Sequence, residues 1–338
     1  MVVIDLECIW GGGMALIDRK YLDSGIGELY QITGMITDIE RYAINDGFGL
    51  RTTVFLKGCP LRCKWCSNPE TQRFNREMIF FQDKCIGCGA CIKLCEYGAL
   101  GKDLIADRSI CDTCYKRDKA FKCIEKCYPK CRKIVGDRMT VKEVVDVVKR
   151  DMPFYQLSGG GVTLSGGEPM AQPEYAYALL KALCENWIDT AIETCGAGEK
   201  QDYEMVAPYL KFVFVDLKAY DSRRHIEWTG ADNTKIKENI ILMDTLAARY
   251  GYELIIRTPV IPGFNDSDEE IRSIAAFVSE NCKNYKGMEL LPYHKLGRGK
   301  YTSLGREYEL SDVTVPFDTR MLELNKILNE FGINIYKF

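Results

Sequence analysis

Residues 53–66 read TVFLKGCPLRCKWC, a short β-rich run followed by three cysteines at the spacing C-x3-C-x2-C. The thiolates of Cys59, Cys63 and Cys66 are one too few to complete a closed iron–sulfur cluster or a structural zinc site. The chain has only two histidines, His225 and His294, and both are far from this loop in sequence. The loop therefore suits a four-iron cluster with one iron open to a further ligand, and a zinc knuckle is the alternative.

Six β-rich runs recur along the chain, and helical patterns separate most of them. The runs are residues 53–56, 162–164, 190–193, 212–217, 253–258 and 288–291. Strands that alternate with helices predict a parallel sheet with right-handed crossovers. Without residues 1–34 and 75–136, roughly 240 residues remain, which is the size of one α/β barrel. We therefore predict an α/β fold, an incomplete TIM-like (β/α)6 barrel.

Helix starts are marked by two capping patterns, in which Thr140 precedes Glu143 and Ser267 precedes Glu270. In such a capping box each partner satisfies a backbone N–H of the other. Residues 175–185 and 236–248 also have helical periodicity. We expect an N-terminal extension over 1–34, the barrel over 35–74 and 137–338, and an insert over 75–136. An ordered strand or helix is the alternative for the extension.

Cysteine is the unusual residue of the composition. Of 16 cysteines, 12 lie from Cys59 to Cys131, in a chain that is 46% hydrophobic and 28% charged. Disulfide frameworks belong to short secreted chains, and the start of this long chain does not read as a signal peptide. Reduced thiols that bind metal in the cytoplasm are the better interpretation. A formal charge of −3 does not favour nucleic acid as a partner, and no apolar run has a membrane span's length.

Eight cysteines of the insert form two four-residue sets. The first, C-x2-C-x2-C-x3-C, is the bacterial ferredoxin spacing, in which the fourth cysteine binds the other cluster. The second has the spacing C-x2-C-x8-C-x3-C. If the fourth cysteine of each set binds the other set's cluster, the two clusters have these ligands: Cys85, Cys88, Cys91 and Cys127 for one, and Cys95, Cys111, Cys114 and Cys123 for the other. Cys131 is either a free thiol or the ligand in place of Cys127, and zinc ribbons are the alternative for the whole insert.

The three-cysteine loop and the later motifs resemble the radical S-adenosylmethionine (SAM) enzymes. Within that superfamily the chain resembles the activating enzymes of glycyl radical enzymes, in the larger form with a two-cluster insert. The motifs are DGFGLR (46–51), NPET (68–71), GGGVT (159–163), SGGEP (165–169), IET (192–194), VDLK (215–218), VIPG (260–263) and LLPYH (290–294). Two positions depart from the family: Phe48 replaces a proline, and Ser67 stands where many members have histidine.

The resemblance implies roles for individual residues. SAM would contact Trp65, Cys66, Ser67, Gly167, Asp216, Leu217, Lys218 and His294. A monovalent cation would lie on Glu193, Thr194 and Asp216. Asp46 and Arg51 would face the partner's glycyl loop. The implied cofactors are three [4Fe-4S] clusters and SAM, with a monovalent cation beside it.

The implied function is activation of a partner glycyl radical enzyme. Reductive cleavage of SAM would give methionine and 5′-deoxyadenosine as a hydrogen atom is taken from one glycine of the partner. A flavodoxin or ferredoxin would supply the electron, and we expect a cytoplasmic monomer. The alternatives are a radical SAM peptide-modifying enzyme with auxiliary clusters and an iron–sulfur electron-transfer protein. The former usually carry their extra cysteines after the barrel.

Overall fold

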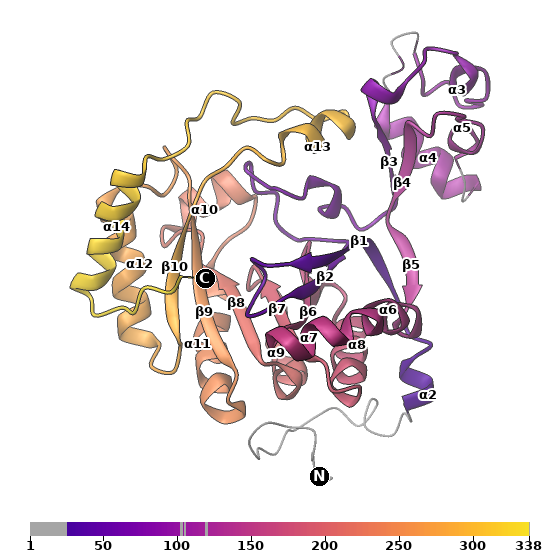
Figure 1. Ribbon diagram of the computed structural model, residues 1–338. Helices are drawn as coiled ribbons and strands as arrows, with labels where there is room; N and C mark the ends of the chain where they lie inside the picture. Colours follow the sequence, from indigo (N-terminus) through magenta and orange to yellow (C-terminus); the bar gives the residue numbers. More distant parts are fainter. Residues whose placement is uncertain (1–25, 102–103, 105, 119–120, 338) are drawn as a thin grey trace.

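A curved sheet of eight strands forms the centre of the molecule, in the order β10-β9-β8-β7-β6-β2-β1-β5 (Figure 1). The structure, a computed structural model, describes residues 26–101, 104, 106–118 and 121–337. Neighbouring strands from β2 to β10 pair in parallel. They are β2 (Arg51–Leu56), β6 (Gly161–Gly166), β7 (Asp189–Thr194), β8 (Phe212–Asp216), β9 (Glu253–Val260) and β10 (Gly287–Pro292). All six predicted strands form, and β10 and β5 are the sheet's two ends, so the incomplete (β/α)6 barrel is confirmed.

Helices cover the outer side of the sheet, because each crossover between parallel strands returns along it. The crossover helices are α6 (Val141–Val148), α7 (Met152–Ser158), α8 (Pro173–Glu185), α9 (Lys200–Val206), α10 (Ser222–Thr229), α11 (Thr234–Tyr250) and α12 (Asp268–Asn281). The last strand is followed by α13 (Arg298–Ser303) and α14 (Asp318–Glu330). Short 3-10 turns are η1 (Pro69–Thr71), η3 (Lys149–Asp151), η4 (Pro169–Ala171) and η5 (Ala207–Tyr209). The main apolar core lies between these helices and the sheet.

Two antiparallel strands extend the sheet beyond β2. β1 (Thr33–Ala43) pairs with β2, and β5 (Asp137–Thr140) pairs with β1. The sequence did not predict either strand. The short helix α2 (Ile26–Leu29) precedes β1, and Leu29 is fully buried in the main core. Residues 26–34 are therefore part of the fold rather than of an extension, while 1–25 lie outside the described residues.

The two predicted capping boxes differ. Thr140 and Glu143 form the complete reciprocal box at the start of α6. At α12, Ser267 accepts a hydrogen bond from the Glu270 N–H, but the Glu270 carboxylate instead accepts from the backbone of Tyr220 and Asp221. The second box is thus only half formed, because Glu270 fastens α12 to the loop after β8.

Residues 77–135 make a separate small unit, which Figure 1 shows at the upper right of the barrel. Its antiparallel pair is β3 (Glu77–Phe80) and β4 (Arg132–Val135). Between them lie η2 (Gln82–Lys84), α3 (Ala90–Lys93), α4 (Arg108–Asp118) and α5 (Lys122–Glu125). Met78, Leu100 and Phe121 pack with the insert's cysteines into a core of its own. The chain thus leaves the barrel and returns to it through adjacent strands.

Alternation along the barrel strands sorts the side chains between the two faces of the sheet. Phe214, Ile255 and Ala191 form an inner cluster, whereas Val213, Val215 and Ile256 belong to the outer core. Arg257 lies over the Phe214 ring, 3.9 Å from its centroid, and so shares the inner face. The interior of the barrel therefore has an apolar base and charged residues above it.

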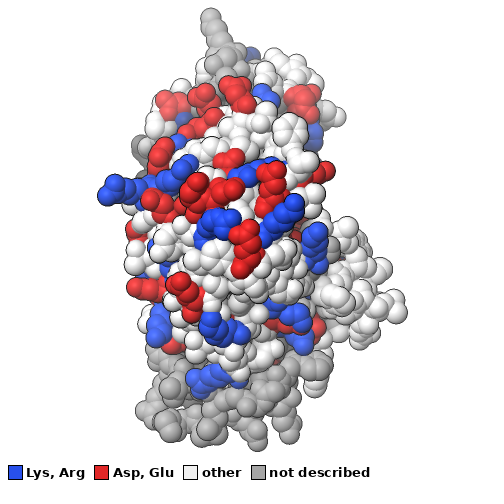
Figure 2. Space-filling view, turned by 90° about the vertical axis from the view of Figure 1, so that its left-hand side faces the viewer, with Lys and Arg blue, Asp and Glu red and all other residues white. Residues whose placement is uncertain are grey.

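Acidic and basic side chains alternate over the face shown in Figure 2. On this side of the molecule, α12 and α14 are joined by the ion pairs Arg272–Glu330 (2.5 Å) and Arg320–Asp268 (2.7 Å). None of the helices in the described part of the chain has the length and apolar character that a membrane span requires.

Candidate functional site

The three-cysteine loop lies directly after β2, at the carboxyl end of the parallel strands. Backbone hydrogen bonds fix it: Cys59 donates to the Gln72 carbonyl (3.2 Å) and Lys64 to the Trp228 carbonyl (3.1 Å). Trp65 packs on the Phe264 ring, with centroids 5.0 Å apart. The loop is thus held against α10 and the segment after β9, at the end of the barrel where enzymes with this architecture place their sites.

Lys218 and Asp216 lie at the end of β8 and form an ion pair beside the loop. Burial raises the pKa of the Cys63 thiol and raises that of Cys66 to about 11, while the Lys218 ammonium acts in the opposite direction. Burial acts to lower the pKa of Lys218, but Asp216 and the thiols outweigh it and raise that pKa. The Lys218 ammonium, paired with Asp216, therefore lies near these thiols and opposes part of the effect of burial on them.

The glycine turn after β6 is packed tightly against the start of the cysteine loop. Gly167 donates to the Leu56 carbonyl (2.9 Å), and Glu168 donates to the Gly58 carbonyl (2.8 Å). A Cβ on Gly167 would lie 2.1 Å from the Gly58 carbonyl oxygen. Glycine at 167 is therefore required by backbone packing, and this contact fixes the turn relative to the three cysteines.

Glu168 is buried and its carboxylate is fully engaged. It accepts hydrogen bonds from the Met170 N–H (3.0 Å), the Cys195 N–H (2.7 Å) and the Thr194 hydroxyl (2.7 Å). The Thr194 hydroxyl also contacts the Tyr203 hydroxyl at 2.9 Å. Of the expected cation ligands, the structure therefore directs Thr194 to the opposite side of β7 from Glu193.

Glu193 belongs to a charged row on the inner face of the barrel. It pairs with Arg257 (2.7 Å), and Arg257 also pairs with Glu289 (2.9 Å). The Ser165 hydroxyl donates to Glu193 at 2.6 Å. The motifs of the sequence did not indicate a role for Arg257 or Glu289. An arginine within the apolar run 253–258 was the available signal, since a charge in a buried strand needs a partner.

Asp46 and Arg51 lie just before and at the start of β2, toward the amino ends of the strands from this charged row. The Asp46 carbonyl accepts from the Thr163 hydroxyl (2.6 Å), and its carboxylate is close enough to Glu193 to act on it electrostatically. Arg51 is fully buried and donates to the Thr163 hydroxyl (2.7 Å) and the Val162 carbonyl (2.8 Å). Burial lowers its pKa to about 10. Arg51 therefore braces the start of β2 against β6, and its expected contact with the partner's glycyl loop stays a prediction.

Two further residues expected to contact SAM lie in different surroundings, since Leu217 is buried and His294 is exposed. Leu217 belongs to the outer core, and its backbone is bound to β9: its N–H donates to the Arg257 carbonyl (2.8 Å) and its carbonyl accepts from the Thr258 hydroxyl (2.7 Å). His294 is exposed just after β10. The Gly297 backbone lies against Cys66 and Ser67, where a Cβ would be 2.8 Å from the Ser67 Cα. The loop after β10 thus closes over the end of the cysteine loop, a contact that the sequence analysis missed.

One expected thiol set of the insert lines a common pocket, made by Cys95, Cys111, Cys114 and Cys123 with apolar neighbours that include Leu100 and Phe121. Burial raises the pKa of Cys111 to about 11 and that of Cys123 to about 12. In the described part of the chain, no three His, Cys, Asp or Glu side chains gather tightly enough to bind a single metal ion. The ligands of a four-iron cluster stand farther apart, because each thiolate binds a different iron atom. The pocket thus brings together the four thiols of one expected set.

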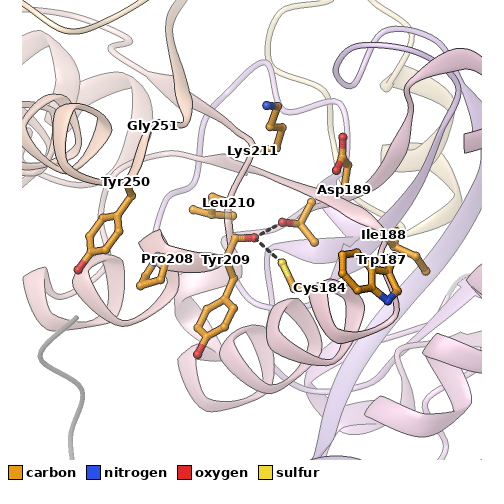
Figure 3. A pocket seen from close by; sticks show the side chains of 11 residues that line it. Cys184, Trp187, Ile188, Asp189, Pro208, Tyr209, Leu210, Lys211, Tyr250 and Gly251 are labelled. Atoms are coloured by element: carbon orange, nitrogen blue, oxygen red, sulfur yellow. Dashed lines mark hydrogen bonds between the residues drawn. The ribbon is translucent and has the colours of Figure 1, made fainter. Parts of the chain in front are cut away.

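A second pocket, drawn in Figure 3, lies at the opposite end of the barrel. It is formed where β7 begins and just before β8, and its lining includes Trp187, Asp189 and Lys211. The Tyr209 carbonyl in its wall accepts hydrogen bonds from Thr190 and from the Cys184 thiol (3.6 Å). Residues at the amino ends of barrel strands serve stability rather than chemistry. We therefore assign the candidate site to the carboxyl end.

Comparison with known proteins identifies similar sequences over most of the chain. Residues 108–275 match the radical SAM superfamily, and residues 78–101 match a 4Fe-4S binding domain. The chain is 42% identical over 304 residues to an isethionate sulfite-lyase activating enzyme of Oleidesulfovibrio alaskensis, covering 88% of this chain and 94% of the relative. It is 40% identical over 313 residues to a 4-hydroxyphenylacetate decarboxylase activating enzyme of Clostridioides difficile, covering 90% and 96%.

A third relative is an indoleacetate decarboxylase activating enzyme of Tractidigestivibacter scatoligenes, 38% identical over 314 residues, which are 90% of this chain and 96% of the relative. Among solved structures, a domain of a pyruvate-formate lyase-activating enzyme from Bacteroides vulgatus is similar, with 26% identity and a TM-score of 0.44. That match covers 53% of this chain and 98% of the domain.

Proposed function

This chain belongs to the radical SAM activating enzymes of glycyl radical enzymes, and we propose that it abstracts a hydrogen atom from one glycine of a partner enzyme. The observation that carries the proposal is the position of the Lys218–Asp216 pair among the thiols of the three-cysteine loop. That loop, the glycine turn and the end of β8 converge at one end of an open barrel. A small cofactor and an extended peptide could both reach this place.

Cys59, Cys63 and Cys66 would hold a four-iron cluster, with SAM bound beside it. When bound, the cluster would supply the electron for the reductive cleavage of SAM, with methionine and 5′-deoxyadenosine as the products. The chain's own residues position this chemistry. The Gly167 turn sets the distance between the cysteine loop and the sheet, and Trp65 with Phe264 shields one side from water.

The two insert sets, with Cys127 or Cys131 completing the first, would hold two further four-iron clusters, giving three in all. The pocket lined by Cys95, Cys111, Cys114 and Cys123 supports this proposal. We infer that these clusters pass electrons from a flavodoxin or ferredoxin or help to dock the partner. Sixteen cysteines, most of them at metal-binding spacings, favour a reducing cytoplasm as the compartment.

A monovalent cation beside SAM would draw its side-chain ligands from Glu193 and Asp216, since the Thr194 hydroxyl is engaged by Glu168. Carboxylate oxygens suit such a hard cation. However, Arg257 already pairs with Glu193, and Lys218 with Asp216. Two fixed cations therefore neutralise the carboxylates that the ion would share.

The partner's glycyl loop would enter through the open side of the barrel and meet the inner row of Glu193, Arg257 and Glu289, with Asp46 below it. This row can pair with peptide N–H and carbonyl groups of an extended loop. The loop must leave its own buried site first, so docking is expected to be weak, because that opening cost reduces the apparent affinity.

The test is anaerobic incubation of the reconstituted chain with SAM, a reductant and candidate glycyl radical enzymes. Because the relatives are named for an isethionate sulfite-lyase and for two arylacetate decarboxylases, enzymes of these classes are the first candidates. We expect a glycine-centred doublet in the electron paramagnetic resonance (EPR) spectrum of one of them, with 5′-deoxyadenosine formed in proportion. Turnover of a non-glycine peptide site instead would establish the peptide-modifying alternative.

A variant with Cys59, Cys63 and Cys66 all changed to alanine is the matched control. It should keep the iron of the insert, about eight atoms per chain, and lose SAM cleavage completely. Residual SAM cleavage by this variant would show that the radical chemistry takes place at another cluster.

A further inference from the structure

The carboxyl end of α10 anchors the three-cysteine loop. A helix ends with carbonyl groups that have no partner within the helix. At the end of α10, the Trp228 carbonyl accepts a hydrogen bond from the Lys64 N–H at 3.1 Å. The next carbonyl, that of Thr229, accepts from the Arg62 N–H at 2.7 Å. Cys63 lies between the two anchored residues of the loop, so its place depends on where this helix end is held.

His225, one turn before the end of α10, fixes the chain that follows the helix. Its side chain is fully buried, with Nδ1 2.6 Å from the Ala231 carbonyl oxygen and 3.0 Å from the Thr229 hydroxyl oxygen. A carbonyl oxygen only accepts hydrogen bonds, so Nδ1 carries the proton. The Thr229 hydroxyl donates to the His225 carbonyl at 2.7 Å, and its oxygen can therefore accept from the same Nδ1–H.

The other ring nitrogen of His225 indicates that the ring is neutral. Among the described residues, the buried Nε2 has no hydrogen-bond partner. A proton on Nε2 would be a buried donor without an acceptor, which costs free energy. Burial also lowers the pKa of His225, and the nearby Lys218 ammonium acts in the same direction. The ring is therefore a donor through Nδ1 alone.

We propose that His225 is a positioning residue of the three-cysteine loop, which acts by fixing the carboxyl end of α10 through its Nδ1–H. The inference rests on the proposed function, in which this loop holds the cluster, whereas the contacts themselves do not. Shortly after Ala231, the Asn233 side chain donates to the Ala219 carbonyl at 2.7 Å. The segment that His225 fixes is thus also tied to the residues after β8, and the cysteine loop and the end of β8 share one support.

The test compares His225→Asn with His225→Gln in the full-length, anaerobically reconstituted chain. The asparagine amide nitrogen takes the place of Nδ1, so this variant keeps the donor and loses part of the ring volume. Glutamine keeps more of the volume but places its amide near the position of Nε2. We expect the amide hydrogens of Arg62 and Lys64 to exchange about tenfold faster in His225→Gln than in the wild type, because a buried hydrogen bond is lost. His225→Asn should stay near the wild type.

Two comparisons separate positioning from a general loss of stability. Glu227→Gln changes an exposed side chain of the same helix and should leave the exchange rates of Arg62 and Lys64 unchanged. The amide hydrogens of α8 should exchange at the same rate in all the variants. Because Cys63 lies between the two anchored amides, iron bound at the loop should be released to a chelator faster in His225→Gln than in His225→Asn.

Three outcomes would overturn the inference. Exchange in His225→Asn that is as fast as in His225→Gln, or faster, would show that the ring volume matters and the donor does not. Unchanged exchange in both variants would show that the end of α10 does not depend on His225. Equal acceleration in α8 would show a general loss of stability. These measurements need neither SAM nor a glycyl radical enzyme, so the inference and the proposed function can fail independently of each other.

Discussion

At the scale of single residues, Gly167 shows how closely two separate loops approach each other. An alanine at this position would place its Cβ 2.1 Å from the Gly58 carbonyl oxygen, and backbone atoms cannot move aside as a flexible side chain could. We expect Gly167→Ala to lower the free energy of unfolding by about 1–3 kcal/mol. SAM cleavage should fall with it, because the turn would move away from the cysteine loop. Urea denaturation and 5′-deoxyadenosine formation measure the two effects.

Gly299 in α13 provides the control for that substitution. No atom lies within 4 Å of the position where its Cβ would be. Alanine is the better helix former, so Gly299→Ala should leave stability unchanged or raise it by up to about 1 kcal/mol. Equal losses of stability in Gly167→Ala and Gly299→Ala would show that the contact with Gly58 is not the cause.

At the scale of secondary-structure elements, Asp151 fastens η3 to the first two strands. Its buried carboxylate accepts from the Arg41 guanidinium on β1 (Nε at 2.9 Å) and from the Thr52 hydroxyl on β2 (2.8 Å). Asp151→Asn keeps the shape but loses the charge and an acceptor, so the variant should lose about 1–2 kcal/mol of stability at pH 7. The measurement is urea denaturation. Asp146→Asn, which breaks only the exposed Lys142 pair on α6, should show no measurable change.

The contribution of Asp151 should also depend on pH. The hydrogen bond from Arg41 holds the pKa of Asp151 below its usual range, against the effect of burial. The stabilisation is therefore fully present above the unfolded-state pKa of about 4 and is lost as the pH falls through the folded-state value. The stability difference between wild type and Asp151→Asn should shrink between pH 5 and pH 3. A constant difference over that range would show that the charge of Asp151 is not involved.

At the scale of the whole molecule, Glu77 joins three parts of the chain. It lies at the start of β3 in the insert and pairs with Lys57 after β2 (3.2 Å) and with Arg306 after α13 (2.5 Å). Burial lowers the pKa of Lys57, and Glu77 opposes that shift. Removing the carboxylate charge in Glu77→Gln leaves the Lys57 ammonium buried without a counter-charge.

We expect Glu77→Gln to cost about 2–4 kcal/mol, because breaking a buried ion pair from one side leaves the other charge uncompensated. Amide hydrogen exchange in β3 and β4 should become faster, since the insert would lose its attachment to the barrel. Glu96→Gln is the comparison within the insert, because the Glu96–Lys122 pair is exposed. Exchange that quickens equally in both variants would argue against a specific anchoring role for Glu77.

The sequence alone predicted the barrel and the thiol sets, because both are encoded in short-range patterns. Hydrophobic patterns that repeat over a few residues were enough to locate all six parallel strands. Cysteine spacing separated the loop at 59–66 from the insert, and the order of the motifs indicated the family. The strands β1 and β5 were missed because their half-exposed antiparallel patterns resemble those of surface segments.

Only the tertiary structure decided which side chains meet. The motifs indicated Glu193, Thr194 and Arg51 as site residues. The strand pleat turns Thr194 toward Glu168 and away from Glu193, and Arg51 is buried. Arg257 and Glu289 come from different strands, and their pairing depends on register. Register is fixed by the folded sheet and not by the spacing of residues within one strand, so the sequence alone does not give this pairing.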